Sequence, residues 1–306
     1  MDVSIIYVNY KTSDLILNSI KSVKEKTKGI FYELIVVDND SQDNSLELIK
    51  NRYPEVICIQ SGENLGFGKA NNLGLEKAKG DFVFFLNPDT LLKNDAISIL
   101  YNFLVRNPNV GACGGNLFDE KNNPTTSFGR VYPSFCRGIL SIFYIPPLFV
   151  RYPKSIFFNY EKNQINVAFI IGADLMIRRS VISSVGGFEP EFFMNYEETE
   201  LCKRIRGSGF DIYSIPSAEI IHLEGRASYI KQSRLFFLYE GQYIYFRKVY
   251  GYKGALLIFY ISQLKNYIRI FQFFMLYNKK KRLYWKMKLE TNKHVWVLFN
   301  KKMNSK

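Results

Sequence analysis

The first 86 residues alternate short continuous apolar runs with segments of helical patterning, and this alternation restricts the fold more than any other feature. The apolar runs are Val3–Val8, Leu34–Val37, Val56–Ile59 and Phe82–Leu86. The helical segments between them cover residues 15–23, 45–52 and 69–79. Apolar runs separated by helices are typical of a parallel sheet covered on both faces. The sequence therefore predicts an α/β protein with a mostly parallel central sheet flanked by helices.

Polar residues follow three of these runs, at Asn9, at Asp38–Asp40 and at Asn87–Asp89. Open sheets of this type bind ligands outside the carboxyl ends of their strands. A carboxylate such as that of Asp89 at a strand end can hold a divalent cation that bridges two phosphates. Asp38 can accept a hydrogen bond from a nucleotide base. The alternative for each Asp is a turn residue or a helix cap, as for Asp40 ahead of the helix at residue 45.

Residues 62–74 contain several glycines and resemble a phosphate-binding loop. Asn71 stands where a dinucleotide-binding fingerprint has its third glycine, which disfavours a dinucleotide fold. The alternative is a turn followed by the start of a helix.

Three carboxylates, Glu197, Glu198 and Glu200, begin a helix predicted over residues 196–206. They can complement the helix macrodipole. They also follow an aromatic run at 192–196, and an apolar environment that raises a carboxylate pKa suits a general base. His222 ends a predicted strand. It is either a structural histidine or a metal ligand beside Asp89, a donor pair that accepts Mn²⁺ or Mg²⁺.

The remaining chain divides into a connection and a helical extension. Residues 116–164 are rich in proline and aromatic residues and are predicted to form a long connection packed over the site. Strands are expected at 167–171, 174–177, 212–215 and 220–222. Helices are expected at 229–250, 255–277 and 281–299. We therefore expect one domain over residues 1–226 and a basic, aromatic helical extension over 227–306.

The chain carries 41 Lys and Arg against 28 Asp and Glu, a net charge of +13, which predicts an anionic partner. The apolar segment 255–277 is followed by Lys279–Arg282, a pattern that favours an anionic membrane surface. The alternative is a helical subdomain packed on the sheet or on a second subunit. Nucleic acid is a rival partner because the chain has many aromatic residues. No recognition motif supports it, and no nucleic acid is expected.

The four cysteines form no CxxC pair, so we expect a reducing compartment and no zinc ribbon. The first residues enter a strand directly, so no secretory signal is expected. No run of 18 apolar residues predicts a membrane span.

Taken in order, the motifs resemble those of the family 2 inverting glycosyltransferases with the GT-A fold. The resemblance covers residues 1–226 and is strongest to the bacterial rhamnosyltransferase branch, which often has Asn-Pro-Asp where other members have Asp-x-Asp. The matching segments are Val3–Tyr10, Val36–Ser41, Asn64–Asn72, Asn87–Asp89, Gly172–Arg178, Gly186–Glu189, Phe192–Phe193, Tyr196–Arg204 and His222.

The resemblance implies a role for each site residue. Asp38 reads the pyrimidine base of a nucleoside-diphosphate sugar, and Asp89 and His222 hold Mn²⁺ or Mg²⁺ on its diphosphate. Glu198 deprotonates the acceptor hydroxyl, with Glu197 as a competing candidate, and Asp174 approaches the sugar or the acceptor. The other positions expected around the donor are Asn9, Asp40, Lys69, Asn71, Asn72 and Asn87.

The implied activity moves rhamnose from a dTDP or UDP donor to a hydroxyl of a cell-surface polysaccharide or lipid-linked glycan. Galactofuranose or another hexose is the alternative sugar. Two departures matter, since Asn87 replaces the first acid of the usual pair and Glu198 stands where the family usually has Asp. A catalytically silent protein of the same fold is therefore a further alternative. The expected location is the cytoplasmic face of the plasma membrane, and the oligomeric state is open.

Overall fold

The computed structural model describes residues 1–143, 156–223 and 231–304, and the chain divides into two compact units. The first unit comprises Met1–Tyr132, Tyr152–Pro190 and Glu197–Ser228. The second comprises Pro133–Arg151, Glu191–Tyr196 and Tyr229–Lys306. The expected boundary between residues 226 and 227 lies outside the described residues. The two-unit division differs from the expectation by assigning two segments from the middle of the chain to the helical unit.

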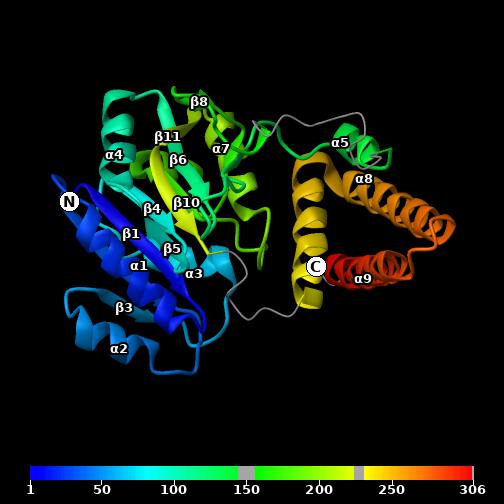
Figure 1. Cartoon of the computed structure of the whole chain (residues 1–306), viewed down its shortest axis with the longest axis horizontal. Coiled ribbons are helices and arrows are strands. Elements are labelled where there is room, and N and C mark those ends of the chain that lie inside the picture. Colours follow the sequence, from blue (N-terminus) through cyan, green and yellow to red (C-terminus); the bar gives the residue numbers. More distant parts are fainter. Residues whose placement is uncertain (144–155, 224–230, 305–306) are drawn as a thin grey trace. The chain divides into compact units, whose positions relative to one another are not determined.

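Four parallel strands form the first half of the sheet in the first unit (Figure 1). Strand β1 (Val3–Asn9) lies between β2 (Tyr32–Asp38) and β4 (Phe82–Leu86), and β3 (Ile57–Gln60) pairs with β2. In this register Asn9 lies opposite Asp38, and Asp38 lies opposite Gln60. The carboxyl ends of these strands therefore meet at one edge of the sheet.

The second half of the sheet is mixed. Strand β10 (Asp174–Arg178) is antiparallel to β4 and to β6 (Val110–Phe118), and β11 (Asp211–His222) runs parallel to β6. Strands β5 (Thr90–Leu92) and β8 (Ile165–Asn166) pair antiparallel with β11. A separate pair joins β7 (Phe128–Gly129) and β9 (Phe169–Ile170).

Helices cover both faces of the sheet because successive strand residues point to opposite sides. On one face, Ile5, Val36 and Phe84 pack with α1 (Ser13–Lys26), α2 (Ser45–Arg52) and α4 (Ala96–Arg106). On the other face, Ile6, Ile35 and Phe85 pack with α3 (Phe67–Leu75), α6 (Arg179–Val185) and α7 (Glu197–Gly207). This arrangement confirms the predicted α/β class with a flanked central sheet.

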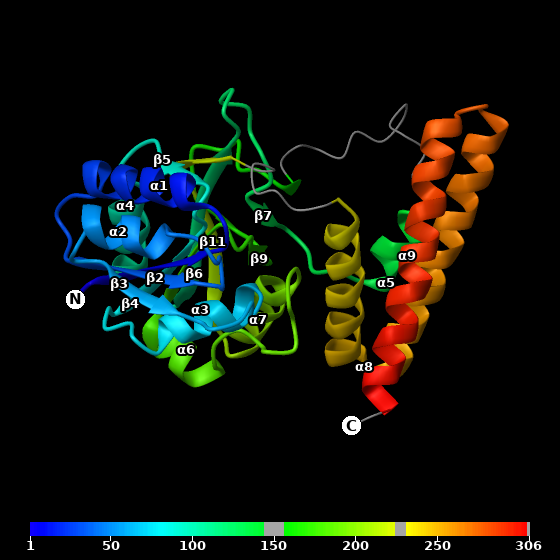
Figure 2. The same cartoon turned by 90° about the horizontal axis from the view of Figure 1, so that it is seen from below.

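The second unit is helical and contains α5 (Phe135–Leu140), α8 (Lys231–Met275) and α9 (Lys279–Asn304) (Figure 2). Its core includes Tyr243, Phe246, Ile258, Trp296 and Phe299. Helix α8 bends at Gly251, which has a φ of 74°, within the gap that the sequence predicts between two helices. No described helix is long and apolar enough to span a bilayer.

The patterning misses the elements between residues 90 and 118, and it divides β11 into two strands. Strand β6 is not predicted because three of its residues are glycine, a residue that is typical of turns and uncommon inside strands. Close packing requires two of them, since a Cβ at Gly114 would lie 2.4 Å from Ile170 Cγ2 and one at Gly115 would lie 2.4 Å from the Ala218 carbonyl oxygen. Strand β11 is one continuous strand, and its register with β6 shifts between Asp211 and Ile212 and between Ser214 and Glu219. Part of the predicted connection over 116–164 lies outside the described residues.

Candidate active site

A hydrogen-bond network centred on Asp38 joins the carboxyl ends of β1, β2 and β3. Asn9 Nδ2 donates to Asp38 Oδ1 at 2.7 Å, and Gln60 Nε2 donates to Asp38 Oδ2 at 3.1 Å. The Ser41 amide also donates to Oδ2 at 3.1 Å. The Asp38 side chain is therefore fixed in a buried position, where each carboxylate oxygen already has a partner. Gln60 was not predicted, although a polar residue at a strand end is the same signal that identified Asn9.

The turns beside this network contain unusual backbone conformations. Lys11, Asp40 and Gln42 have φ values of 57°, 65° and 54°. Non-glycine residues seldom adopt this left-handed region, and such strain concentrates at functional sites. Asp40 is partly exposed in this turn and accepts a hydrogen bond from Gln42 at 3.4 Å. The strained turns support a binding role for this edge of the sheet.

Helix α3 carries three residues that were expected near the donor, and the side chains of two of them form hydrogen bonds within the protein. Asn71 Nδ2 donates to the Phe67 carbonyl of the same helix at 3.0 Å. The Asn72 amide donates to the Phe188 carbonyl at 2.7 Å and accepts from the Phe188 amide at 2.8 Å. Asn72 therefore fixes the segment at residue 188, and of the three only Lys69 is exposed.

Asp89 and His222 are distant in the sequence and are brought together by the pairing of β5 with β11. His222 lies opposite Thr90 in the β5–β11 pair, and its Nε2 is 3.3 Å from Asp89 Oδ1. The Asn87 amide nitrogen is 3.5 Å from the same Nε2. Carboxylate and imidazole together suit Mn²⁺, so the pair fits a divalent cation. Within the described ranges no group of three His, Cys, Asp or Glu side chains is gathered for a metal, so the described residues would supply only this pair.

A two-residue segment, Gly172 and Ala173, connects the Asn87–Asp89 turn with the start of α7. The backbone N–H of Asn87 donates to the Ala173 carbonyl at 3.0 Å. A Cβ at Gly172 would lie 3.9 Å from Glu198 Cβ and 3.2 Å from the Phe67 ring. Glu198 and the Asn87–Asp89 turn therefore flank the same short segment, at the end of the sheet where Asp38 lies.

The two carboxylates at the start of α7 have different surroundings. Burial raises the pKa of Glu197 well above its usual value, and the neighbouring Glu198 carboxylate raises it further. Glu197 Oε2 is buried with no hydrogen-bond partner. Burial also raises the pKa of Glu198, which is less buried and accepts a hydrogen bond from Thr199 at 3.3 Å. Glu198 is thus the better placed of the two to meet a ligand.

Glu200, the third carboxylate of this helix, has a structural partner. Arg204 donates from Nε to Glu200 Oε1 at 2.9 Å and from Nη2 to Oε2 at 2.8 Å. The same guanidinium donates to the carbonyls of residues 185, 186 and 187. Arg204 and Asn72 together hold the 185–188 segment, which leaves Glu197 and Glu198 as the candidate bases.

Asp174 is completely buried at the start of β10. Its Oδ2 accepts the Gly115 amide at 2.6 Å, and its Oδ1 has no hydrogen-bond partner. Burial raises the pKa of this carboxyl well above its usual value. The predicted contact of Asp174 with a sugar or acceptor therefore finds no support in this position.

Comparisons with known proteins agree with this arrangement. Residues 4–186, more than half of the chain, match the model of the family described as "Glycosyl transferase family 2". The chain belongs to glycosyl transferase family 2. A curated relative from Mycobacterium tuberculosis, N-acetylglucosaminyl-diphospho-decaprenol L-rhamnosyltransferase, is 30% identical over 203 residues, which are 62% of this chain and 66% of that protein. This chain thus spans slightly less than two thirds of that relative.

Other similar proteins support the same family and fold. Rhamnosyltransferase WbbL from Escherichia coli is 26% identical over 72% of this chain and 83% of its own length. The mannosyltransferase PcManGT from Pyrobaculum calidifontis, solved with GDP-Man and Mn²⁺, has a TM-score of 0.58 and 14% identity over 96% of this chain and 86% of that chain. GalNAc-T7, solved with UDP, GalNAc and Mn²⁺, has a TM-score of 0.56 and 15% identity over 81% of this chain and 50% of that chain. The predicted GT-A architecture is confirmed.

Proposed function

We propose that this protein is an inverting, metal-dependent glycosyltransferase that uses a nucleoside-diphosphate sugar. The observation that carries the proposal is that Glu198 and the Asn87–Asp89 turn flank the Gly172–Ala173 segment, with His222 paired to Asp89 of that turn. A catalytically silent protein would have no need to bring a carboxylate–imidazole pair and a buried base candidate together. The family membership also favours a transferase over a nucleic-acid-binding protein.

Each group has a defined task in this reaction. Asp89 and His222 would hold Mn²⁺ or Mg²⁺, which neutralises charge on the leaving nucleoside diphosphate. Glu198 accepts the proton of the acceptor hydroxyl as that oxygen attacks the anomeric carbon. The bond to the donor phosphate breaks on the opposite side, so one displacement inverts the anomeric centre. A raised pKa keeps the Glu198 carboxylate basic enough to take this proton.

We propose rhamnose as the transferred sugar, dTDP or UDP as its carrier, and a lipid-linked or cell-surface glycan as the acceptor. The printed names of the M. tuberculosis and E. coli relatives support the sugar, and "diphospho-decaprenol" in the first supports a lipid-linked acceptor. Galactofuranose or another hexose remains the alternative for the sugar.

Binding of a donor panel tests the proposal. The purified chain would be mixed with dTDP- and UDP-sugars, with and without Mn²⁺ or Mg²⁺, and its thermal unfolding followed. We expect one donor to raise the unfolding temperature only when a metal is present, and an Asp89→Asn variant to lose this shift. Glu200→Gln is the matched control, since it removes a nearby carboxylate that Arg204 already engages. No metal-dependent shift with any donor, in a folded protein, would contradict the proposal.

We also propose that the tip between α8 and α9 binds an anionic membrane. Phe271, Phe274, Met275, Leu276 and Tyr277 are each at least 55% exposed at this tip. Lys279, Lys280 and Lys281 follow directly and are exposed. Aromatic side chains beside lysines suit the interface of a bilayer that contains anionic lipid. Such a surface would hold the enzyme at the membrane that carries its acceptor.

Flotation with vesicles tests this surface. The wild-type chain is expected to float with vesicles that contain phosphatidylglycerol and not with neutral vesicles. A variant with the three tip lysines changed to Gln is expected to lose flotation. The control changes three exposed lysines of the first unit to Gln, namely Lys21, Lys26 and Lys28. Equal flotation of the tip variant and the control would contradict the assignment.

A further inference from the structure

The helical unit contains a cavity whose polar lining consists of hydrogen-bond donors and neutral groups. It has a volume of about 150 Å³ and is lined by residues of α5, α8 and α9 together with Tyr196. Lys265 and Lys288 both line it, and no Asp or Glu is among its lining residues. Among the described residues neither lysine forms an ion pair with a carboxylate. Two cations therefore share one cavity without an anion.

The surroundings of the two lysines disfavour their charged form and lower both pKa values. Burial and the nearby Lys265 charge lower the pKa of Lys288 to about 8. Burial and Arg269 lower the pKa of Lys265. Lys288 gains two compensating contacts, because its Nζ lies 4.7 Å from the centre of the Trp285 ring and 5.5 Å from that of Tyr284. An anion in the cavity would relieve both the desolvation and the mutual repulsion.

Asn266 adds a buried hydrogen-bond donor to the cavity. It lines the same cavity and is 2% exposed, and its Nδ2 has no hydrogen-bond partner of normal geometry, although its side chain interacts with the Tyr239 hydroxyl, whose pKa burial raises and this contact lowers. Buried donors without a partner are rare in folded proteins. An oxygen of a ligand that lies between the two lysines would satisfy this donor.

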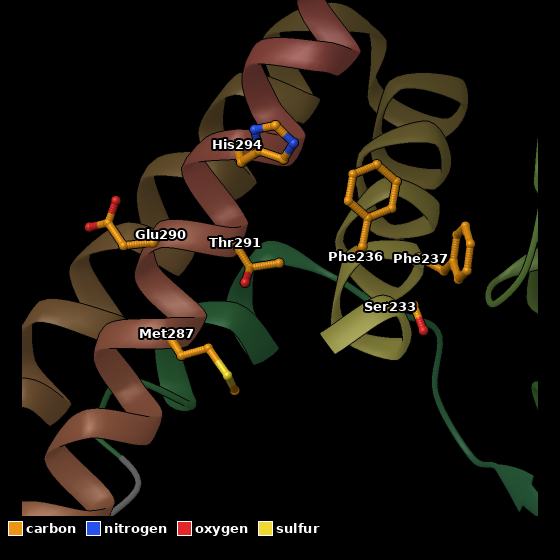
Figure 3. Close-up of a pocket in the computed structure, with 7 residues that line it drawn as sticks. All are labelled: Ser233, Phe236, Phe237, Met287, Glu290, Thr291 and His294. Atoms are coloured by element: carbon orange, nitrogen blue, oxygen red, sulfur yellow. The ribbon is translucent and has the colours of Figure 1, made fainter. Parts of the chain in front are cut away.

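An apolar groove of about 600 Å³ is lined by residues of the same two helices (Figure 3). Phe236 and Phe237 of the groove directly precede Leu238 and Tyr239 of the cavity, and Met287 directly precedes Lys288. Met287 and Thr291 project from α9 toward the α8 segment that carries Phe236, whereas the Glu290 carboxylate points away from it. The groove therefore offers an apolar surface, and a flexible methionine, next to the cationic cavity.

We propose that the cavity binds the phosphate groups of an isoprenoid-phosphate acceptor and that the groove binds the first part of its hydrocarbon chain. This inference rests on the proposed function, because it assigns a place to the acceptor of that reaction. It is separate from the donor site at the sheet edge. Along the chain, Tyr196 of the cavity directly precedes Glu197 and Glu198.

Binding of small isoprenoid phosphates by the full chain, with EDTA present to prevent metal-dependent binding at the donor site, tests the inference. Titration calorimetry would compare farnesyl diphosphate, pyrophosphate and farnesol. We expect farnesyl diphosphate to bind more tightly than either of the others. The double variant Lys265→Gln, Lys288→Gln is expected to lose at least ~100-fold in affinity for it, since each charged hydrogen bond is worth about tenfold or more.

Three further variants separate the two parts of the ligand and control for surface charge and for folding. Phe236→Ala is expected to weaken farnesyl diphosphate and leave pyrophosphate unchanged. Lys286→Gln removes an exposed charge of α9 outside the cavity and is the matched control, expected to bind as the wild type does. Lys288→Arg keeps the charge and is expected to retain binding, which guards against a loss caused by misfolding.

The outcomes that overturn the inference are distinct. If neither farnesyl diphosphate nor pyrophosphate binds, the proposed phosphate site is wrong. It is also wrong if the double lysine variant binds farnesyl diphosphate as tightly as the wild type does. Pyrophosphate that binds as tightly as farnesyl diphosphate would mark a site for free anions and overturn the lipid assignment. Failure of the proposed function is recognised separately, because the double lysine variant is expected to keep its metal-dependent donor shift. A lost donor shift with intact farnesyl diphosphate binding would fault the active site alone.

Discussion

Replacing Lys288 by Met should change the pH dependence of stability by a calculable amount. Met keeps the unbranched stem and removes the charge. Lowering the Lys288 pKa from 10.5 to about 8 corresponds to about 3 kcal/mol of differential interaction. Because the folded-state pKa is below the unfolded one, the unfolded chain binds more protons between these pH values. Stability should therefore rise as the pH increases from about 8 to 10.5.

The comparison of wild type and variant isolates this lysine from the other titrating groups. The free energy of unfolding in urea would be measured at pH 7.5 and pH 10 by tryptophan fluorescence. Both tryptophans, Trp285 and Trp296, lie in the helical unit and report its unfolding. We expect the stability of Lys288→Met relative to wild type to fall by about 2 kcal/mol between these pH values. Tyr239 of the cavity does not interfere, because burial raises its pKa to about 12.

The control and the refuting result are simple. Lys286→Met changes an exposed lysine two residues earlier and should show no such pH-dependent difference. If Lys288→Met differs from wild type equally at both pH values, Lys288 is fully charged in the folded protein. An anion in the cavity would then bring Lys288 no relief from desolvation.

Three further predictions concern the first unit. Asn72→Ala should lower the free energy of unfolding, measured in urea, by about 2 kcal/mol, because two hydrogen bonds to Phe188 are lost. Unchanged stability would mean that Arg204 alone holds the 185–188 segment. His222→Ala should weaken Mn²⁺ binding more than about tenfold by calorimetry in the presence of donor; equal affinity would exclude His222 as a ligand. Burial raises the pKa of Glu198 above 4.5, so the midpoint of the loss of donor turnover at acid pH should lie above 4.5. A midpoint at or below 4.5 would contradict the assignment of Glu198 as the base.

The parallel half of the sheet could be predicted from the sequence because its strands are continuous apolar runs that end in polar residues. The same rule identified Asn9, Asp38 and Asp89 and would have found Gln60. Strand β6 could not be found in this way. Its glycines are required by contacts with Ile170 and Ala218, which are distant in the sequence.

Side-chain roles were harder to predict than strand positions. Asn72 and Asn71 occur in a segment that resembles a ligand-binding loop, yet their amides bond to the protein, and the partner of Asn72 lies 116 residues away. Asp174 directly follows the Gly172–Ala173 segment of the site, but its side chain is completely buried in the core. Lys265 and Lys288 belong to a basic tail for which the sequence favoured an anionic membrane surface, and only the packing of α8 against α9 shows that both line one cavity.

Donor turnover by the Glu198→Gln variant tests the central claim most directly. Release of nucleoside diphosphate from the donor identified by thermal shift would be measured for wild type, Glu198→Gln and Glu197→Gln. The account predicts that Glu198→Gln binds the donor normally but turns it over to an acceptor at least ~100-fold more slowly, as expected for loss of a general base. It predicts that Glu197→Gln retains most of the activity. Full activity of Glu198→Gln would contradict the assignment of the base and, with it, the proposed chemistry at this edge of the sheet.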